Sequence, residues 1–285
     1  MSVVGTGDLV EDAVRRSGAV LAVNVITLEH AEAIVAAATV AGRGLILQVS
    51  ENAVAYHHGS PEPIIAAVHA LAELAPVPLA VHLDHLTDEA LVERVLRPPS
   101  SELVSSLMYD AGALPYAENL ERTGAIARRA HDRGLWVEAE LGFVGGKGGV
   151  ARNAHESGVR TDPTEAAEFV AATGVDALAV AVGSSHAMTE QTARIDTDLV
   201  RSIATAVPVP LVLHGSSGVP DDELRGAVAA GIRKVNVGTA LNKAMTSAVR
   251  SSLAADERVT DPRRWLDPAR EAMTASVAHL LEVLR

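Results

Sequence analysis

The sequence predicts an α/β protein that folds as a (β/α)8 barrel, the TIM barrel, in a single domain. Three observations predict it. Eight short apolar runs alternate with Ala-rich amphipathic segments, no change of composition divides the 285 residues, and the length suits one barrel of about 250 residues. A doubly wound sheet would usually have about five or six strands and a Gly-rich turn after the first. Gly5-Thr6-Gly7 follows no strand, so it is not that turn.

Most of the apolar runs are continuous, as expected for parallel strands that are covered on both faces. The expected strands are Val20–Val25, Gly44–Val49, Pro78–Asp84, Leu103–Tyr109, Trp136–Leu141, Ala177–Val182, Pro210–His214 and Lys234–Val237. The expected helices are Leu28–Ala41, Pro63–Leu74, Asp88–Leu96, Tyr116–Arg133, Pro163–Thr173, Asp196–Ala206 and Asp221–Ala230. Pro163 suits a first helical position, and Gly134 and Gly231 suit helix ends.

The last part of the chain is expected to extend the barrel. Ser251–Asp267 is polar and predicts a link from the eighth unit to a C-terminal helix ending at Arg285. Residues 251–285 then form a helical extension of one domain that spans residues 1–285. The Gly-rich segment Gly142–Thr161 lacks apolar periodicity and follows the fifth strand, so it is expected to be an active-site lid.

Composition excludes several classes of function. The net charge of -12 argues against binding to a nucleic-acid backbone, and an aromatic content of 2% argues against base-stacking surfaces. The absence of cysteine excludes disulfides, zinc–thiolate sites and cysteine nucleophiles. No signal peptide and no apolar run of about 18 residues is visible, so a cytoplasmic protein without a membrane partner is expected.

Polar side chains stand at the carboxyl end of every expected strand, where barrels of this type build their active sites. In strand order they are Asn24; Ser50; Asp84 with His85; Asp110; Glu138 with Glu140; Ser184 to His186; His214 to Gly218; and Asn236 to Thr239. The sequence therefore predicts a functional site at this face.

Three histidines at that face, His85, His186 and His214, match a catalytic zinc arrangement with an open position. A lone histidine would be read as structural, but three on one face indicate a metal. Glu140 and Asp110 are candidate extra ligands or partners of ligands, or members of salt bridges with arginine. Asp84 is a candidate acid–base, or it orients a neighbouring histidine.

Two turns predict a phosphate site. His214–Gly218 and Asn236–Thr239 follow the seventh and eighth strands, where barrels often bind phosphate through backbone N–H groups and a helix N-terminus. The chain has three lysines, Lys147, Lys234 and Lys243, and none is expected at a carboxyl strand end. Because Lys234 is expected to start the eighth strand at the opposite end, a Schiff-base mechanism is disfavoured.

Nearly the whole chain resembles the class II, metal-dependent ketose-bisphosphate aldolases of the fructose- and tagatose-bisphosphate type. The resemblance is carried by Val81–His85, Val137–Gly142, Ala179–Gly183, Leu211–Gly215 and Lys234–Val237. It implies an enzyme of carbohydrate metabolism, such as one of glycolysis. The implied reaction is a zinc-dependent, reversible aldol cleavage of a phosphorylated ketose to dihydroxyacetone phosphate and an aldehyde, through a metal-stabilised enediolate.

The resemblance also implies roles for individual residues. His85, His186 and His214 would hold one divalent metal, with Glu140 and Asp110 as alternative ligands, and a second metal or a monovalent cation is compatible with the family. Asp84 would exchange the proton of the C4 hydroxyl. The other implied contacts are with the substrate: Asn24, Ser50, Ala187, Gly215, Ser216, Ser217, Asn236, Val237, Gly238 and Thr239. A homodimer or homotetramer is implied as well.

Three departures from the family pattern predict a diverged member. Ala187 and Met188 follow the second histidine in place of glycine and an aromatic residue, Lys147-Gly148-Gly149 replaces acidic loop residues, and Leu86 replaces a glycine. Three alternatives therefore stay open: a different keto-sugar or keto-acid phosphate as substrate, another metal-dependent enzyme such as a hydrolase, and a non-catalytic sugar-phosphate binding protein.

Overall fold

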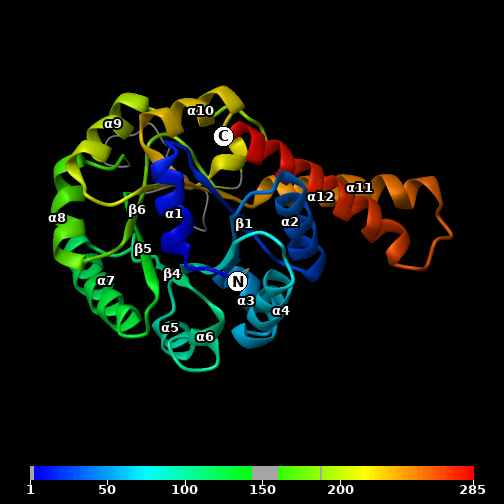
Figure 1. Ribbon diagram of the computed structural model, residues 1–285, viewed down its shortest axis with the longest axis horizontal. Coiled ribbons are helices and arrows are strands. Elements are labelled where there is room, and N and C mark those ends of the chain that lie inside the picture. The colour runs from blue at the N-terminus through cyan, green and yellow to red at the C-terminus, as the bar shows by residue number, and fades with distance from the viewer. Residues whose placement is uncertain (1–2, 143–159, 187) are drawn as a thin grey trace.

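The computed structural model describes residues 3–142, 160–186 and 188–285. Eight parallel strands form a closed barrel in chain order, and β8 pairs with β1 to close it (Figure 1). The strands are β1 Val20–Asn24, β2 Leu45–Ser50, β3 Leu79–Leu86, β4 Ser106–Tyr109, β5 Trp136–Leu141, β6 Ala177–Val180, β7 Leu211–Leu213 and β8 Ile232–Val237. The predicted TIM barrel is confirmed.

Helices surround the barrel and bury its outer face. The seven helices expected from the sequence are present, each within two residues of its expected bounds: α2 Leu28–Ala41, α4 Pro61–Glu73, α5 Glu89–Val95, α7 Tyr116–His131, α8 Pro163–Thr173, α9 Thr197–Ala206 and α10 Asp221–Ala230. The helix α8 shows why the sequence signals worked. Asp162 accepts hydrogen bonds from the N–H groups of Thr164 and Glu165, and Gly174 ends the helix at φ +70°.

Within the described residues, four further helices were not expected from the sequence: α1 Thr6–Arg15, α3 Glu51–Tyr56, α6 Ser100–Leu103 and α11 Thr239–Ala255. Leu103 was expected to begin the fourth strand, but it ends α6, and β4 begins only at Ser106. The short helix follows Pro99 and carries an acid, Glu102, in its first turn. Such an acid suits the positive end of a helix, and this start signal outweighs the β propensity of the following residues.

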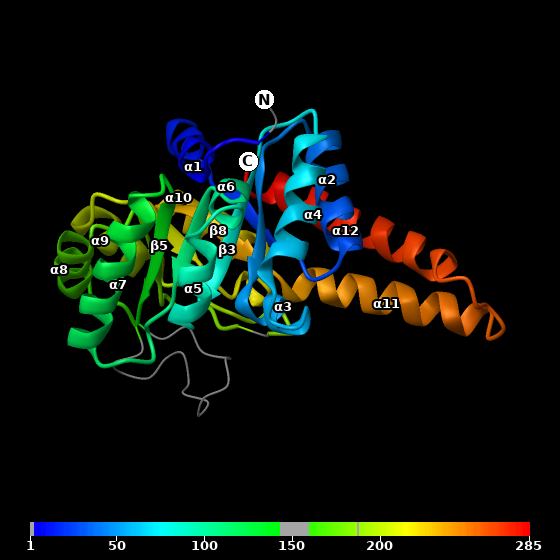
Figure 2. The same ribbon diagram turned by 90° about the horizontal axis from the view of Figure 1, so that it is seen from below.

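The expected link over residues 251–267 is wrong at both ends, because α11 continues to Ala255 and α12 starts at Arg263 and runs to Val283. The two helices lie side by side and extend beyond the barrel (Figures 1 and 2). Apolar residues at helical spacing along α11, Leu241, Ala244 and Met245 among them, pack against the core. The helix α12 also packs on α2. No helix in the part of the chain that the structure describes is long and apolar enough to cross a membrane.

The interior of the barrel is polar in one layer. Lys234 lies within β8, and its Nζ reaches Glu138 of β5 on another side of the barrel, so both side chains point inward. Both are fully buried. The expectation that Lys234 starts the strand is wrong, because β8 begins two residues earlier. The helix α1 lies at the amino end of the barrel (Figure 2). It is anchored there by Thr6, whose Oγ1 lies 2.5 Å from the Oγ of Ser106 on β4.

Candidate active site

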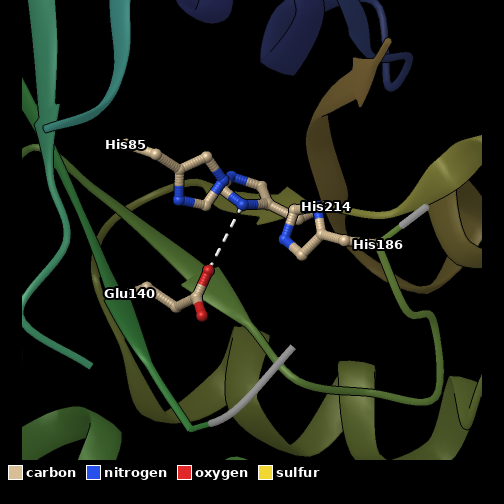
Figure 3. A group of neighbouring side chains, drawn as sticks. All are labelled: His85, Glu140, His186 and His214. Carbon is tan, nitrogen blue, oxygen red and sulfur yellow. Dashed lines mark ion pairs between the residues drawn. The ribbon is translucent and has the colours of Figure 1, made fainter. Parts of the chain in front are cut away.

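Four side chains from four of the five neighbouring positions between β3 and β7 converge at the carboxyl end of the barrel. They are His85 from β3, Glu140 from β5, His186 from the segment after β6 and His214 directly after β7. One ligand atom from each lies within 4.8 Å of the others. Figure 3 shows the three imidazole rings and the carboxylate pointing toward one another. The sequence singled out all four residues.

Carboxylates contact two of the three imidazole rings, those of His85 and His214, on the side away from the four-residue group. The Nδ1 of His85 lies 2.8 Å from the Oδ2 of Asp110, and the Nε2 of His214 lies 2.8 Å from the Oε1 of Glu138. Each contact leaves the other ring nitrogen toward the four-residue group, and the Nδ1 of His214 is 3.3 Å from the Oε2 of Glu140. Such carboxylate–histidine contacts orient metal ligands. Asp110 therefore contacts the ring of a candidate ligand and lies outside the four-residue group.

The electrostatics of the group favour a cation. Burial by itself would lower the pKa of His214, but the neighbouring carboxylates of Glu138 and Glu140 raise it to about 9. Burial would raise the pKa of Glu138, but the Lys234 ammonium and His214 lower it to about 2. The two carboxylates therefore favour positive charge at this position, either a proton on the imidazole or a metal ion that displaces that proton.

The donor set fits a divalent metal. Three imidazoles and one carboxylate are the nitrogen and oxygen ligands that Zn²⁺ takes in catalytic sites. The Nδ1 of His214 is buried and makes no hydrogen bond among the described residues beyond its 3.3 Å ion-pair contact with Glu140, and a metal bound there would satisfy it. His85 adopts a positive φ of 53°, a strained conformation that the surrounding structure maintains at this site.

A cavity of about 660 Å³ opens beside the group and is lined by residues that follow the strands. Nine of the predicted substrate and acid–base residues line it: Asn24, Ser50, Asp84, Gly215, Ser216, Ser217, Asn236, Gly238 and Thr239. Val237 is buried and does not line it, and Ala187 lies outside the described residues. The sequence did not single out several other lining residues: Ile26, Gln48, Glu51, Asn52, Thr87 and Asn242.

Asp84 lies between two amides at the edge of this cavity. The Nδ2 of Asn24 is 3.3 Å from its Oδ2, and the Nδ2 of Asn236 is 3.4 Å from its Oδ1. The Nε2 of His85 is 3.9 Å from the same carboxylate. The two amides fix the plane of the carboxylate beside the histidine group, which is where an acid–base has to stand.

The two predicted phosphate turns form two helix starts on the cavity wall. Gly215 adopts φ +66° before a 3-10 helix, η1, at Ser216–Gly218. A Cβ at Gly215 would lie 2.5 Å from the carbonyl of Ser185, so only glycine fits. Gly238 precedes α11, and the N–H of Ala240 in its first turn donates to Ser217 Oγ. Helix starts of this kind bind anions through their N–H groups.

Sequence reasoning missed the roles of Glu138 and Lys234. A signal was present, since Glu138 is two residues from Glu140 and Lys234 is two from Asn236. Residues two apart on a strand point to the same face, so each pair had to share the barrel interior. The predicted lid falls mainly on residues 143–159, outside the described residues, and so does Lys147.

Comparisons with known proteins agree with this geometry. The family model of class II fructose-bisphosphate aldolase matches residues 4–285. A fructose-bisphosphate aldolase of Geobacillus stearothermophilus is 36% identical over 279 residues, covering 97% of this chain and 95% of that protein.

Two solved structures share the architecture. The crystal structure of the YdjI aldolase from Escherichia coli K12 is 28% identical, with a TM-score of 0.84 over 99% of this chain and 97% of that one. The crystal structure of fructose-bisphosphate aldolase from Campylobacter jejuni is 21% identical, with a TM-score of 0.84 over 99% and 95% of the two chains. At that identity the second likeness supports the fold alone.

Proposed function

The chain belongs to the class II fructose-bisphosphate aldolase family, a family of metal-dependent carbon–carbon lyases, and from this premise we propose that it is a zinc aldolase. The proposed reaction is the reversible cleavage of a phosphorylated ketose to dihydroxyacetone phosphate and an aldehyde. The observation that carries the proposal is the convergence of three histidines and Glu140 beside a cavity that Asp84 lines.

His85, His186 and His214 would hold the metal, with Glu140 as a further ligand and Asp110 orienting His85. When bound, a zinc ion supplies a Lewis acid that stabilises the negative charge arising at the ketone as the carbon–carbon bond breaks. The carboxylates around His214 support this assignment, because they favour a cation at the group.

Asp84 would take the proton of the C4 hydroxyl in cleavage and return it in condensation. Its position supports this role, because the amides of Asn24 and Asn236 hold the carboxylate at the cavity beside His85. No lysine lines this cavity among the described residues, and Lys234 is fully buried and bonded to Glu138, which is consistent with a mechanism that uses no Schiff base.

The phosphate of the substrate would bind at the turn after β7 and at the start of α11. Gly215, Ser216 and Ser217 face the cavity from one turn, and Gly238 and Thr239 face it from the other. Asn24 and Ser50 would contact the remaining hydroxyl groups. Val237 and Ala187 stay predictions as backbone contacts, as does a homodimer or homotetramer.

The first test follows one half of the reaction. The zinc-loaded protein is incubated with dihydroxyacetone phosphate in D2O, and NMR follows exchange of the C3 protons. This half-reaction can be measured without knowing the aldehyde. We expect stereospecific exchange that requires the metal, because the metal stabilises the enediolate formed when a C3 proton leaves. His214→Ala should lose both zinc and exchange. A zinc-loaded wild-type protein that exchanges no proton would contradict dihydroxyacetone phosphate as the donor and favour a binding protein or another keto substrate.

A further inference from the structure

A buried ion pair lies in the barrel below the candidate metal group and outside the cavity. The Nζ of Lys234 is 2.8 Å from the Oε2 of Glu138, and both side chains have 0% exposure. Neither residue lines the cavity, so neither contacts substrate there. Taking two charges out of water is costly, and well-packed apolar residues often serve stability as well or better. Stability alone is therefore a weak explanation for this pair.

One branch from the pair leads to the metal group. The second carboxylate oxygen of Glu138, Oε1, lies 2.8 Å from the Nε2 of His214. With Nε2 held in this way, the Nδ1 of His214 faces Glu140. Lys234 balances the charge of Glu138, so Glu138 can remain a carboxylate that accepts from the imidazole.

A second branch leads to Asp84. The Nζ of Lys234 also donates to the Oδ1 of Asn236 at 2.8 Å. An amide has one oxygen and one nitrogen at its end, so a donor on the oxygen fixes where the NH2 group points. That group lies 3.4 Å from the Oδ1 of Asp84 and 3.1 Å from the Nε2 of His214.

We propose that Lys234 is a positioning residue whose single ammonium fixes the orientation of two groups in the reaction centre. Through Glu138 it holds the imidazole of His214, and through Asn236 it holds the carboxylate of Asp84. The role assigned to Asp84 rests on the proposed aldolase function, whereas the hold on His214 does not depend on it. Lys234 touches neither substrate nor metal, so its effect has to appear through these two neighbours.

The test removes the ammonium at nearly constant side-chain length. Lys234→Met leaves Glu138 as a buried unpaired charge and can fail to fold for that reason alone. The double variant Lys234→Met/Glu138→Gln removes both charges and keeps an acceptor next to His214. Arg201→Met, which removes an exposed cation from α9, is the matched control. Each protein is measured for thermal unfolding, for zinc affinity against a competing chelator, and for kcat and KM in aldol cleavage.

We expect the double variant to unfold close to the wild-type temperature and yet to bind zinc about 10- to 100-fold more weakly, as other losses of ligand-orienting groups do. Its kcat in cleavage should fall by about 100-fold because Asp84 is misplaced, while KM changes by less than about threefold. The Arg201→Met control should match the wild type in every measurement.

Two results would overturn the proposal. A double variant with wild-type zinc affinity and kcat would show that Lys234 orients neither His214 nor Asp84. A double variant that still fails to fold would show that the pair is a structural requirement of the barrel. The zinc measurement separates the failure of the aldolase proposal from the failure of the Lys234 proposal. An inactive wild-type protein would contradict the aldolase function, but the zinc affinity of the double variant would still test whether Lys234 orients His214.

Discussion

Two buried histidines in the same barrel have opposite electrostatics. His214 lies between the carboxylates of Glu138 and Glu140, which outweigh burial and raise its pKa to about 9. His82 on β3 is also fully buried, but burial and the nearby Lys234 lower its pKa to about 3, and its Nδ1 is 2.8 Å from the Oγ of Ser106. One histidine is thus suited to a cationic site, and the other is a neutral part of the polar interior.

The neutral His82 makes the protein sensitive to mild acid. The unfolded chain protonates this residue below a pKa of about 6.5, whereas the folded protein resists protonation down to about 3. The unfolded state binds more protons in that window, so this contribution to stability is present above pH 6.5 and is lost as pH falls toward 3. The loss is about 1.4 kcal/mol per pH unit, or about 2 kcal/mol between pH 7 and pH 5.

Urea unfolding of the metal-free protein at pH 7 and pH 5 measures this loss. His82→Gln keeps a polar group near Ser106 but does not titrate. The variant should therefore lose about 2 kcal/mol less than the wild type over the same interval. The difference between the two proteins cancels the titration of His214. Equal losses in both proteins would mean that His82 is protonated in the folded state as well.

At the same scale, the sequence was sufficient for residues that carry chemistry at the carboxyl end of a strand. His85 and Glu140 are the last but one residues of β3 and β5, and His214 directly follows β7, so each stands where an apolar run ends. Glu138 and Lys234 were not, because a charged residue inside an apolar run reads as part of the strand, and its partner on another strand is invisible without the barrel closure. Long-range pairing of buried charges is decided by tertiary structure.

Among the elements, the turn between β7 and η1 has a strict steric requirement. Gly215 adopts φ +66°, and a Cβ there would lie 2.5 Å from the Ser185 carbonyl and 3.0 Å from the backbone nitrogen of His186. The substitution Gly215→Ala should cost about 1–3 kcal/mol from the backbone conformation, and more from the clash. It should also weaken zinc binding, because the clash displaces the segment that holds His186.

A second glycine provides the control for this prediction. Gly42 ends α2 at φ +60°, and a Cβ there would meet nothing within 4 Å. Gly42→Ala should therefore carry the backbone cost of about 1–3 kcal/mol without the clash and without any change in zinc affinity. Chemical denaturation and a chelator competition measure both quantities. Equal zinc affinities for the two variants would mean that the turn after β7 does not position His186.

The helix α1 shows why some elements could not be predicted from local sequence. Gly5 precedes it and Gly7 lies in its first turn, and glycine is a poor helix former. In the structure Asp8 caps α1 by accepting from the N–H of Gly5, and Leu9, Val10 and Ala13 are buried on one side. Packing against the end of the barrel outweighs the local propensity of the glycines.

For the whole molecule, the candidate metal group joins parts of the chain that are far apart in sequence. Its members come from β3, β5, the segment after β6 and the end of β7, so they span half of the closed sheet. If any of these strands or segments detached from the barrel, its side chain would no longer reach the candidate metal group. A ligand that binds all four at once therefore binds the folded state and has no comparable site in the unfolded chain.

Zinc should for this reason raise the stability of the entire barrel in a single transition. At a free zinc concentration of about 100 times the dissociation constant, mass action adds about 2.7 kcal/mol. For a domain of this size each kcal/mol shifts the unfolding temperature by about 2–4 °C, so the shift should be about 5–10 °C. A chelator should reverse it.

His214→Ala, which removes a ligand and the imidazole between Glu138 and Glu140, should unfold at a temperature that zinc does not change. Calorimetry with and without zinc measures both proteins, and a shift of equal size in the variant would place the metal elsewhere in the molecule.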